Sequence, residues 1–568
     1  MASQYSPYCV PLNPNHLRKS RKIRVVCIGA GFAGITLGYK IAHEMKLEDG
    51  SLNILTNSGQ SHPGGTWAAN HYPGLMCDVP IHVYTLPFNP KHDWKNFLAT
   101  GPEILEYILE TTKKFDLERL MKFNTRVVDA AFDEAIGKWN LTVESEGAIW
   151  HDQCDVLIGA SGTQRQASHM PNIPGLNGFK GKLVHTGDWD DSLDWKGKKV
   201  GVIGNGSSGI QVFRAMQPEA ASITHYIRKP TWISMSYAHQ FTPEGRNFAY
   251  SSEQLESFKT PENLFKYRKM IESFNNGLFM RLVFNDTSKG AKQAFRAELE
   301  RWMSDRLHGD PELVNRLKPS YQPWCRRLTP EDKYLEALQA PNAELVDSRI
   351  EAITDNGIRN CDGSFRPFDI IVLATGFVNN RIPPWTMQGR GGITLAERWK
   401  DNVDGYISVC APDMPNYFSI GCGPNFPIAN GPVLSAMGFV SNYILKWALK
   451  IASEDIKSVC VKNERVEAYN IYLQEILRRT AWNEDCDSWY KKGKIDEYRT
   501  GITAIYPGSM NHFREMLSEL RGEDFDFVYN TNNPFNFVGN GLTKVDLDEN
   551  GDLASYLADT VKFDHFIP

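Results

Sequence analysis

Two glycine-rich turns, each placed between a short apolar run and a helical pattern, constrain the fold of this chain more than any other feature. Residues 24–28 and 199–203 are the apolar runs, and both contain several β-branched side chains. The glycines that follow are Gly29, Gly31 and Gly34 in the first turn, and Gly204, Gly206 and Gly209 in the second. A strand, a tight turn and a helix in this order open a βαβ unit whose turn brings backbone amides close to a pyrophosphate. The sequence therefore predicts an α/β fold with two Rossmann-like dinucleotide-binding domains.

The chain is too long for one hydrophobic core, because 568 residues correspond to about three to four domains. Thr260-Pro261 is a helix start signal, and beyond it apolar residues recur at helical spacing at Phe295, Leu299, Trp302, Met303 and Leu307. A third apolar run at 370–373 is a further strand. We expect an N-terminal arm at 1–22, a first nucleotide domain at 23–175 and 380–545, a second at 176–238 and 333–379, a helical insertion at 239–332, and a C-terminal tail at 546–568.

Composition and charge exclude several function classes. A net charge of −5 on this length gives no reason to expect binding to nucleic acid or to an anionic membrane. The basic N-terminal residues are not followed by an apolar signal-peptide core. The most apolar long stretch, 432–449, is interrupted by polar residues and predicts a buried helix rather than a membrane span. We expect a cytoplasmic enzyme with no obligate protein partner.

The ten cysteines are scattered singly along the chain. They form neither a redox CxxC nor the paired spacing of a zinc site, so no metal is expected. This pattern argues for a reducing compartment, and it argues against the flavin disulfide reductases, which also carry two nucleotide domains.

The first glycine turn lacks one expected partner. About twenty residues beyond such a turn an acid normally accepts the ribose hydroxyls, but Thr56 stands at that position. Its hydroxyl offers one such hydrogen bond, so ribose binding is expected to differ in detail and to be weaker. The alternative is a glycine-rich turn without a ligand.

The second turn predicts NADPH rather than NADH. The strand at 223–227 ends in Arg228-Lys229, where an NAD site carries an acid. Two cations suit the 2′-phosphate of NADP, and arginine engages it bidentately. Ser207 and Ser208 add hydroxyl donors in the turn. The alternative is a solvated charge pair.

The link between the two nucleotide domains contains the strongest motif. Five spaced residues form the pattern FxGxxxHxxxWD, namely Phe179, Gly181, His185, Trp189 and Asp190. This pattern, flanked by two dinucleotide turns, resembles that of the Baeyer–Villiger monooxygenases, flavoenzymes that insert an oxygen atom next to a ketone carbonyl. The resemblance implies that the motif couples domain movement to the position of NADP. From the residue alone, His185 is also a candidate general base.

A second segment strengthens the resemblance. The runs Gly64-Gly65-Thr66-Trp67, Tyr72-Pro73-Gly74 and Cys77-Asp78 are similar to the family's GGTW, YPG and CD elements. The resemblance implies that FAD is contacted by Thr66, Trp67, Asp78 and Tyr84, and that the backbone of Val127 meets its adenine. Without the resemblance, the glycine pair is a turn and Asp78 is a surface carboxylate.

Cys325-Arg326-Arg327 is similar to the family's CRR motif, whose last arginine is catalytic. The physical case is independent, because oxygen insertion places negative charge on the former ketone oxygen and a guanidinium stays cationic at any working pH. Asp78 is the expected partner that fixes the arginine's orientation. The alternative is a charge cluster at the start of a helix capped by Thr329-Pro330.

Trp489, in Cys486-Asp487-Ser488-Trp489, also resembles a family position, and the implied role is packing against bound NADP. A lone tryptophan is otherwise more often a core residue. The glycine-containing run before the helix at 432–449 is expected to direct that helix's N-terminus at the flavin.

These motifs span residues 24 to 540 and imply an FAD- and NADPH-dependent Baeyer–Villiger monooxygenase. Through a flavin peroxide, such an enzyme converts a linear or cyclic ketone and O₂ into an ester or lactone. The alternatives are a flavin monooxygenase that oxidises nitrogen or sulfur, and a nucleotide-binding redox sensor without catalysis. The sequence does not identify the ketone, the regioselectivity or the oligomeric state.

Overall fold

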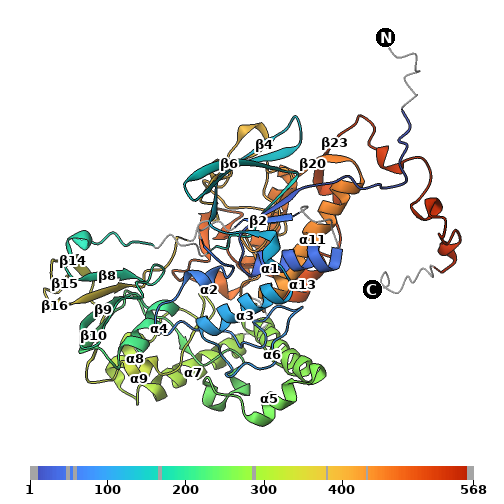
Figure 1. Ribbon diagram of the computed structural model, residues 1–568. Coiled ribbons are helices and arrows are strands. Elements are labelled where there is room, and N and C mark those ends of the chain that lie inside the picture. The colour runs from blue at the N-terminus through green and yellow to red at the C-terminus, as the bar shows by residue number, and fades with distance from the viewer. Residues whose placement is uncertain are drawn as a thin grey trace.

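Two five-stranded parallel sheets form the centres of two α/β units in the computed structural model (Figure 1). The structure describes residues 11–45, 52–55, 60–163, 169–284, 289–378, 381–429, 431 and 433–558. The first sheet has the order β19-β7-β1-β2-β3, and the second has the order β13-β10-β9-β17-β8. All neighbouring strands in both sheets are parallel. The predicted α/β fold with two Rossmann-like domains is confirmed.

The strands of both sheets are short, and those at and beside the centre of each sheet are the most buried. Those of the first sheet are β1 (Val25–Ile28), β2 (Leu52–Leu55), β3 (Met121–Lys122), β7 (Val156–Gly159) and β19 (Tyr417–Ser419). Those of the second are β8 (Lys182–His185), β9 (Lys199–Ile203), β10 (Ser222–Tyr226), β13 (Ala343–Val346) and β17 (Ile370–Leu373). Strands covered on both faces read as continuous apolar runs, which is how 24–28 and 199–203 are recognised.

The late part of the chain returns to the first unit. Strand β19 pairs with β7. A four-stranded sheet beside it joins β18 (Thr386–Gln388) to β4 (Thr125–Asp133), β5 (Lys138–Ser145) and β6 (Ala148–Cys154). The apolar stretch near 432 forms α11 (Val433–Ser453), which packs on α1 (Phe32–Tyr39). It is a buried helix, as its sequence predicts.

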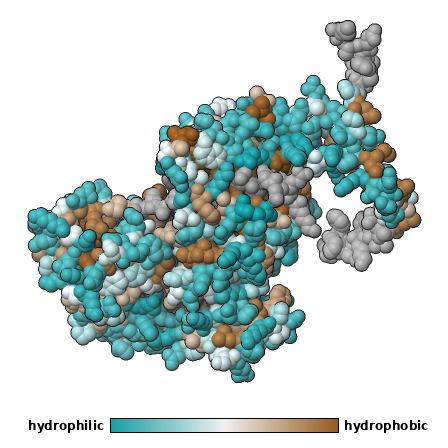
Figure 2. Space-filling model, viewed as in Figure 1, coloured by the Kyte–Doolittle hydropathy of each residue, from teal (hydrophilic) through white to brown (hydrophobic). Residues whose placement is uncertain are grey.

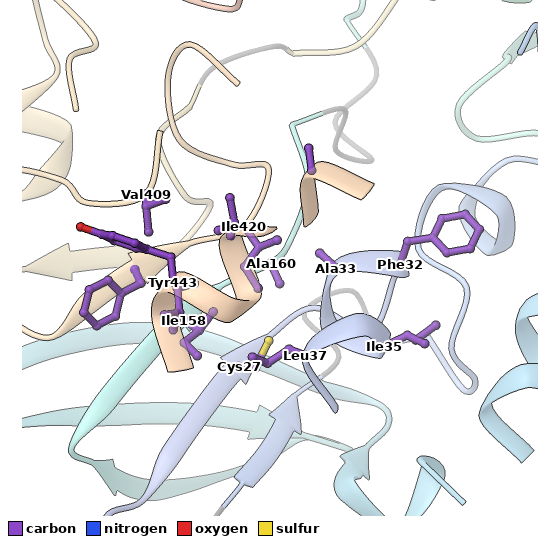
Figure 3. Packing of buried hydrophobic residues seen from close by; sticks show 14 of the residues in the cluster. Cys27, Phe32, Ala33, Ile35, Leu37, Ile158, Ala160, Val409, Ile420 and Tyr443 are labelled. Atoms are coloured by element: carbon purple, nitrogen blue, oxygen red, sulfur yellow. The ribbon is translucent and has the colours of Figure 1, made fainter. Parts of the chain in front are cut away.

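The core of the first unit lies between these helices and the sheet. Figure 3 shows side chains from β1, α1, β7 and α11 converging in one cluster, among them Cys27, Leu37, Ile158 and Tyr443. All four are essentially inaccessible to solvent. Because α1 begins at the glycine turn, this packing also fixes the turn.

A helical segment lies between residues 234 and 329 and runs along the bottom of the view in Figure 1. Its helices are α5 (Ser252–Phe258), α6 (Pro261–Leu282), α7 (Lys289–Arg306) and α8 (Pro311–Leu317). Helix α6 begins at the predicted proline. The apolar face of α7, with Leu299 and Met303 buried, packs into the core of the second unit.

The other elements are mostly short. They include α2 (Thr66–Ala69), α3 (Gly101–Lys114), α4 (Ser207–Met216), α9 (Tyr334–Ala337), α10 (Leu395–Arg398), α12 (Asn463–Arg478), α13 (Met510–Met516), β11 (Ile233–Ser234), β12 (Thr329–Pro330), β14 (Ile350–Ile353), β15 (Gly357–Asn360), β16 (Phe365–Pro367), β20 (Ile456–Val461), β21 (Lys491–Ile495), β22 (Thr500–Ile502) and β23 (Phe525–Tyr529).

Residues 15–18 and 537–542, near the two ends of the described chain, pair with each other beside the body, and the chain continues from them in different directions (Figure 1). Leu17 N–H donates to the Leu542 carbonyl at 2.7 Å, and Arg18 N–H donates to that of Phe537 at 2.8 Å. Hydrophobic side chains such as Leu547 and Leu553 are exposed near the C-terminal end of the described chain (Figure 2). Across the described residues, no helix has both the length and the apolarity needed to cross a bilayer.

Candidate active site

A cleft of about 2180 Å³ lies between the two units. Pockets for drug-sized ligands are typically about 300–1,000 Å³, so this cleft has room for two dinucleotides. Both glycine turns line it, together with these predicted residues: Thr66, Trp67, Asp78, Tyr84, Val127, Ser207, Ser208, Arg228, Lys229, Arg327 and Trp489. Thr56 lies outside the described residues.

The first glycine turn has the close contacts that such a turn requires. A Cβ on Gly34 would lie 2.0 Å from the Gly29 carbonyl oxygen, so the helix packs on the turn only because residue 34 is glycine. Gly31 is the N-cap of α1, and no described side chain caps it. The first amides of α1 and the positive end of its dipole are therefore available to an anion in the cleft.

The second glycine turn repeats this geometry. A Cβ on Gly209 would lie 1.9 Å from the Gly204 oxygen, whereas one on Gly206 would meet open space. His225 supports the turn, because its Nε2 donates a hydrogen bond to the Gly204 carbonyl oxygen at 2.9 Å. The Tyr334 hydroxyl donates to His225 Nδ1 at 2.8 Å, so Nε2 carries the proton. Burial lowers the pKa of His225 to about 4, which keeps the ring neutral.

Around the first turn, the aromatic residues predicted by resemblance contact each other. The Trp67 indole donates to the Tyr84 hydroxyl at 3.3 Å, and their rings meet edge to face at 5.9 Å. Trp67 stands on α2, directly after the paired glycines. Val127 is buried in β4, at a part of the cleft also lined by Asn124 and Glu144.

Arg327 and Asp78 form a two-bonded pair in the cleft. The arginine Nη2 donates to Asp78 Oδ1 at 2.6 Å, and Nε donates to Oδ2 at 3.2 Å. Their side chains are 32% and 15% exposed, so the pair faces the cleft rather than bulk solvent. A bidentate pair of this kind fixes the plane of the guanidinium, as the sequence predicts for Asp78.

Two tyrosines complete the surroundings of Arg327. Its guanidinium lies 5.8 Å from the ring centre of Tyr237. Burial lowers the pKa of the arginine, but the charge of Asp78 and the hydroxyls of Tyr237 and Tyr490 raise it, and the resulting pKa is above the ordinary value. Arg327 is therefore a permanent cation. Tyr237 was missed from the sequence, because a single tyrosine outside any motif carries no signal.

The segment after Arg327 is a strand rather than a helix. Thr329–Pro330 form β12, which pairs with β11, and the next helix begins only at Tyr334. The alternative of a charge cluster at the start of a capped helix is therefore wrong. Farther along, Glu331 pairs with Arg214 of α4 at 3.0 Å, which ties this segment to the second unit.

A disulfide joins Cys325 to Cys486, 161 residues farther along the chain. It connects the segment of Arg327 to the segment of Trp489, whose ring packs edge to face on Tyr490 at 4.7 Å. The sequence predicted no particular cysteine pairing, because the ten cysteines are scattered singly along the chain. Sequence spacing reveals only cysteines that are close in the chain, and these two are brought together by the fold.

The FxGxxxHxxxWD motif lies in and beside β8. A Cβ on Gly181 would lie 2.5 Å from the Asp369 oxygen, so β8 approaches its neighbour only with glycine there. The Gly187 amide donates to His185 Nδ1 at 2.9 Å, and His185 Nε2 lies 3.3 Å from the Thr375 hydroxyl. Burial lowers the pKa of His185. One ring nitrogen thus holds a backbone amide and the other meets a side-chain hydroxyl, and these structural contacts favour a hinge over a general base.

The other motif residues have structural contacts as well. Trp189 is buried in the core of the second unit, and Phe179 packs against a smaller, separate hydrophobic cluster. Asp190 accepts hydrogen bonds from the Ser192 amide and hydroxyl at 2.9 and 2.5 Å, which lowers the pKa of its carboxyl.

Two family profiles match the chain. One, described as flavin-binding monooxygenase-like, matches residues 74–279. The other, an NAD(P)-binding Rossmann-like domain, matches residues 27–100.

Among related proteins, the FAD-binding monooxygenase tazF of Aspergillus terreus is 42% identical over 94% of this chain and 95% of its own length. The FAD-binding monooxygenase stcW of Emericella nidulans is 31% identical over 96% of this chain and 89% of its own.

Among solved structures, a closed cyclohexanone monooxygenase has a TM-score of 0.76 at 24% identity, over 90% of this chain and 100% of its own. OTEMO in complex with FAD and NADP has a TM-score of 0.75 at 23% identity over the same shares. At this identity these structures support the fold alone.

Proposed function

Since the chain belongs to the family of FAD-binding monooxygenases, we propose that it is a Baeyer–Villiger monooxygenase that uses NADPH and O₂ to convert a ketone into an ester or lactone. The observation that supports this reaction is the bidentate Arg327–Asp78 pair in the cleft between the two glycine turns.

The residues of the cleft fit the two cofactors. We assign FAD to the first turn, with Trp67, Tyr84 and Asp78 along its length, and NADPH to the second turn, with Arg228 and Lys229 at the 2′-phosphate. Uncapped helix starts at Gly31 and Gly206 fit the two pyrophosphates. When bound, FAD supplies the capture of O₂ after reduction by NADPH.

Arg327 is the proposed catalytic residue. Insertion of oxygen next to a carbonyl places negative charge on the former ketone oxygen, and a guanidinium donates two hydrogen bonds to such an anion. Asp78 accepts from Nε and from one N–H of Nη2, so the second N–H of Nη2 and those of Nη1 are the donors that can meet the reacting oxygen. Because the pKa of Arg327 is above its ordinary value, the charge needs no proton transfer during the reaction.

The test compares the wild type with Arg327→Ala on a panel of linear, cyclic and fused-ring ketones. We expect NADPH to reduce the flavin of the variant as in the wild type, while ester formation, measured by mass spectrometry, falls about 10²–10³-fold. Arg24→Ala is a matched control, because Arg24 binds Asp152 through the same two nitrogens at 3.0 and 2.6 Å, outside the cleft. Wild-type ester yields from Arg327→Ala would remove this residue from the mechanism.

The second candidate, oxidation of nitrogen or sulfur, does not require the arginine. The same two enzymes assayed with a thioether separate the reactions, because loss of Arg327 should abolish ester formation more than sulfoxide formation.

A further inference from the structure

The cation predicted to bind the cofactor's 2′-phosphate already holds a carboxylate. Lys229 Nζ donates to Asp487 Oδ2 at 2.6 Å, and both residues line the cleft. The side chain of Asn205, in the second glycine turn, donates to the Lys229 carbonyl at 2.8 Å. This bond holds Lys229 beside the turn, where a bound nucleotide presents its ribose.

Asp487 is surrounded by positive charge. The hydrogen bond and charge of Lys229 lower the pKa of its carboxyl, and Arg228 and Arg326 lower it further. The group is therefore ionised at neutral pH. An anion thus occupies a cluster of cations whose charge suits a phosphate.

The backbone beside Asp487 is held in place. Its neighbour Cys486 is bonded to Cys325, which directly precedes the arginine segment. A tethered group keeps a high effective concentration at its partner even when its own bond is weak. Asp487 therefore stays near Lys229 whether or not a nucleotide is bound.

On the premise that the second turn binds NADPH, we propose that Asp487 is a specificity-determining residue whose carboxylate competes with the 2′-phosphate for Lys229. An ammonium group is a compact point charge, so strong pairing with one anion weakens its pairing with another. Nucleotides without a 2′-phosphate leave the Lys229–Asp487 pair intact, so Asp487 does not change their affinity. Asp487 thereby sets the margin by which this site prefers NADPH over NADH.

The test measures binding of 2′,5′-ADP and 5′-ADP to the FAD-loaded enzyme by calorimetry, without turnover. In Asp487→Asn the affinity for 2′,5′-ADP should rise about threefold to tenfold, while that for 5′-ADP stays unchanged. In a Lys229→Ala background the same substitution should raise the affinity for 2′,5′-ADP much less, because the contested cation is gone and only the weaker influence of Arg228 and Arg326 on Asp487 remains.

Glu256→Gln is the matched control. Glu256 pairs with Lys259 on α5 at 2.6 Å, and these side chains are 73% and 59% exposed, against 63% and 62% for Asp487 and Lys229. Both substitutions remove one negative charge, but Glu256 does not line the cleft. We expect no change in affinity for either nucleotide.

Three outcomes would overturn the inference. If the wild type prefers 2′,5′-ADP but Asp487→Asn binds it no more tightly, NADPH remains the assigned cofactor and the competition is wrong. If Glu256→Gln raises the affinity for 2′,5′-ADP as much as Asp487→Asn does, the rise comes from the change in net charge and not from competition for Lys229. If the wild type binds 2′,5′-ADP no better than 5′-ADP, the NADPH assignment fails, and this inference fails with it.

Discussion

Arg327 and Asp78 are 249 residues apart in the chain and meet only because both units contribute to one cleft. At the scale of single residues, the structure provides an internal comparison for this pair. Arg24 and Asp152 form the same two-bonded arrangement, with exposed fractions of 31% and 11% against 32% and 15%. The two pairs share this bonding and a similar exposure, although Asp152 also accepts from the Gln153 amide and Arg327 also lies beside Tyr237. A difference in ester formation between their variants therefore reports mainly on the cleft.

We predict that Asp78→Asn and Asp152→Asn each lower the free energy of unfolding by a similar amount, about 1 to 2 kcal/mol, because each weakens a charge-assisted hydrogen bond. Only Asp78→Asn should also slow ester formation, by about tenfold, because the guanidinium loses its fixed orientation. Chemical denaturation gives the first quantity and product analysis gives the second. Equal ester rates in the two variants would show that Asp78 does not orient the catalytic group.

At the scale of elements, β10 supports the second glycine turn through a buried histidine. The pKa of His225 is lowered to about 4 by burial, whereas an unfolded histidine titrates near 6.5. Well above pH 6.5 the ring is neutral in both the folded and the unfolded state, so the contribution of His225 to the free energy of unfolding is fully present. As the pH falls from 6.5 to 4, only the unfolded state binds a proton, so the fold loses stability.

This linkage predicts that His225 alone lowers the free energy of unfolding by about 3 kcal/mol as the pH falls from 6.5 to 4. His225→Asn should be less stable at neutral pH, because it loses the Tyr334 and Gly204 contacts, but its stability should fall less on acidification. Denaturation curves at several pH values measure both. An unchanged pH slope in His225→Asn would contradict the lowered pKa.

Elements were predictable where their signals are local. The glycine turns were found because tight packing, such as that of Gly34 on Gly29, leaves no other residue type possible. The start of α6 was found because a proline at the first helical position has its φ already set for a helix and lacks only an amide that would be unpaired there; Thr260 is the N-cap, but its side chain makes no capping bond. By contrast, the Cys325–Cys486 bond, the Lys229–Asp487 pair and the place of Tyr237 depend on contacts between distant segments. No local spacing encodes them, and only Arg327 and Asp78 were paired in advance, through a resemblance.

At the scale of the whole molecule, the two units meet where α4 packs on the segment that leads to Asp78. The Tyr72 hydroxyl donates to Gln211 Oε1 of α4 at 3.0 Å, and Gln211 Nε2 donates to the Met76 carbonyl at 3.0 Å. Helix α4 begins at the second glycine turn. The position of the NADPH site relative to the first cofactor therefore depends on this contact.

Gly74 is the tightest point of the contact between the units, which makes it the place to test their coupling. Its φ is +79°, and a Cβ there would lie 2.7 Å from the Gln211 carbonyl oxygen and 2.9 Å from the Ala215 Cβ. Gly197, with φ +68°, has nothing within 4 Å of such a Cβ. Alanine at either position costs about 1 to 2 kcal/mol for the left-handed backbone, but only Gly74→Ala pushes α4 away from the first unit.

We therefore expect flavin reduction by NADPH, followed by stopped-flow absorbance, to be slowed about tenfold or more in Gly74→Ala and to be unchanged in Gly197→Ala. A displacement near 1 Å is enough to cost up to about 10²-fold in a reaction between two positioned groups. Equal reduction rates in the two variants would mean that the contact between the units stabilises the fold without setting the distance between the cofactors.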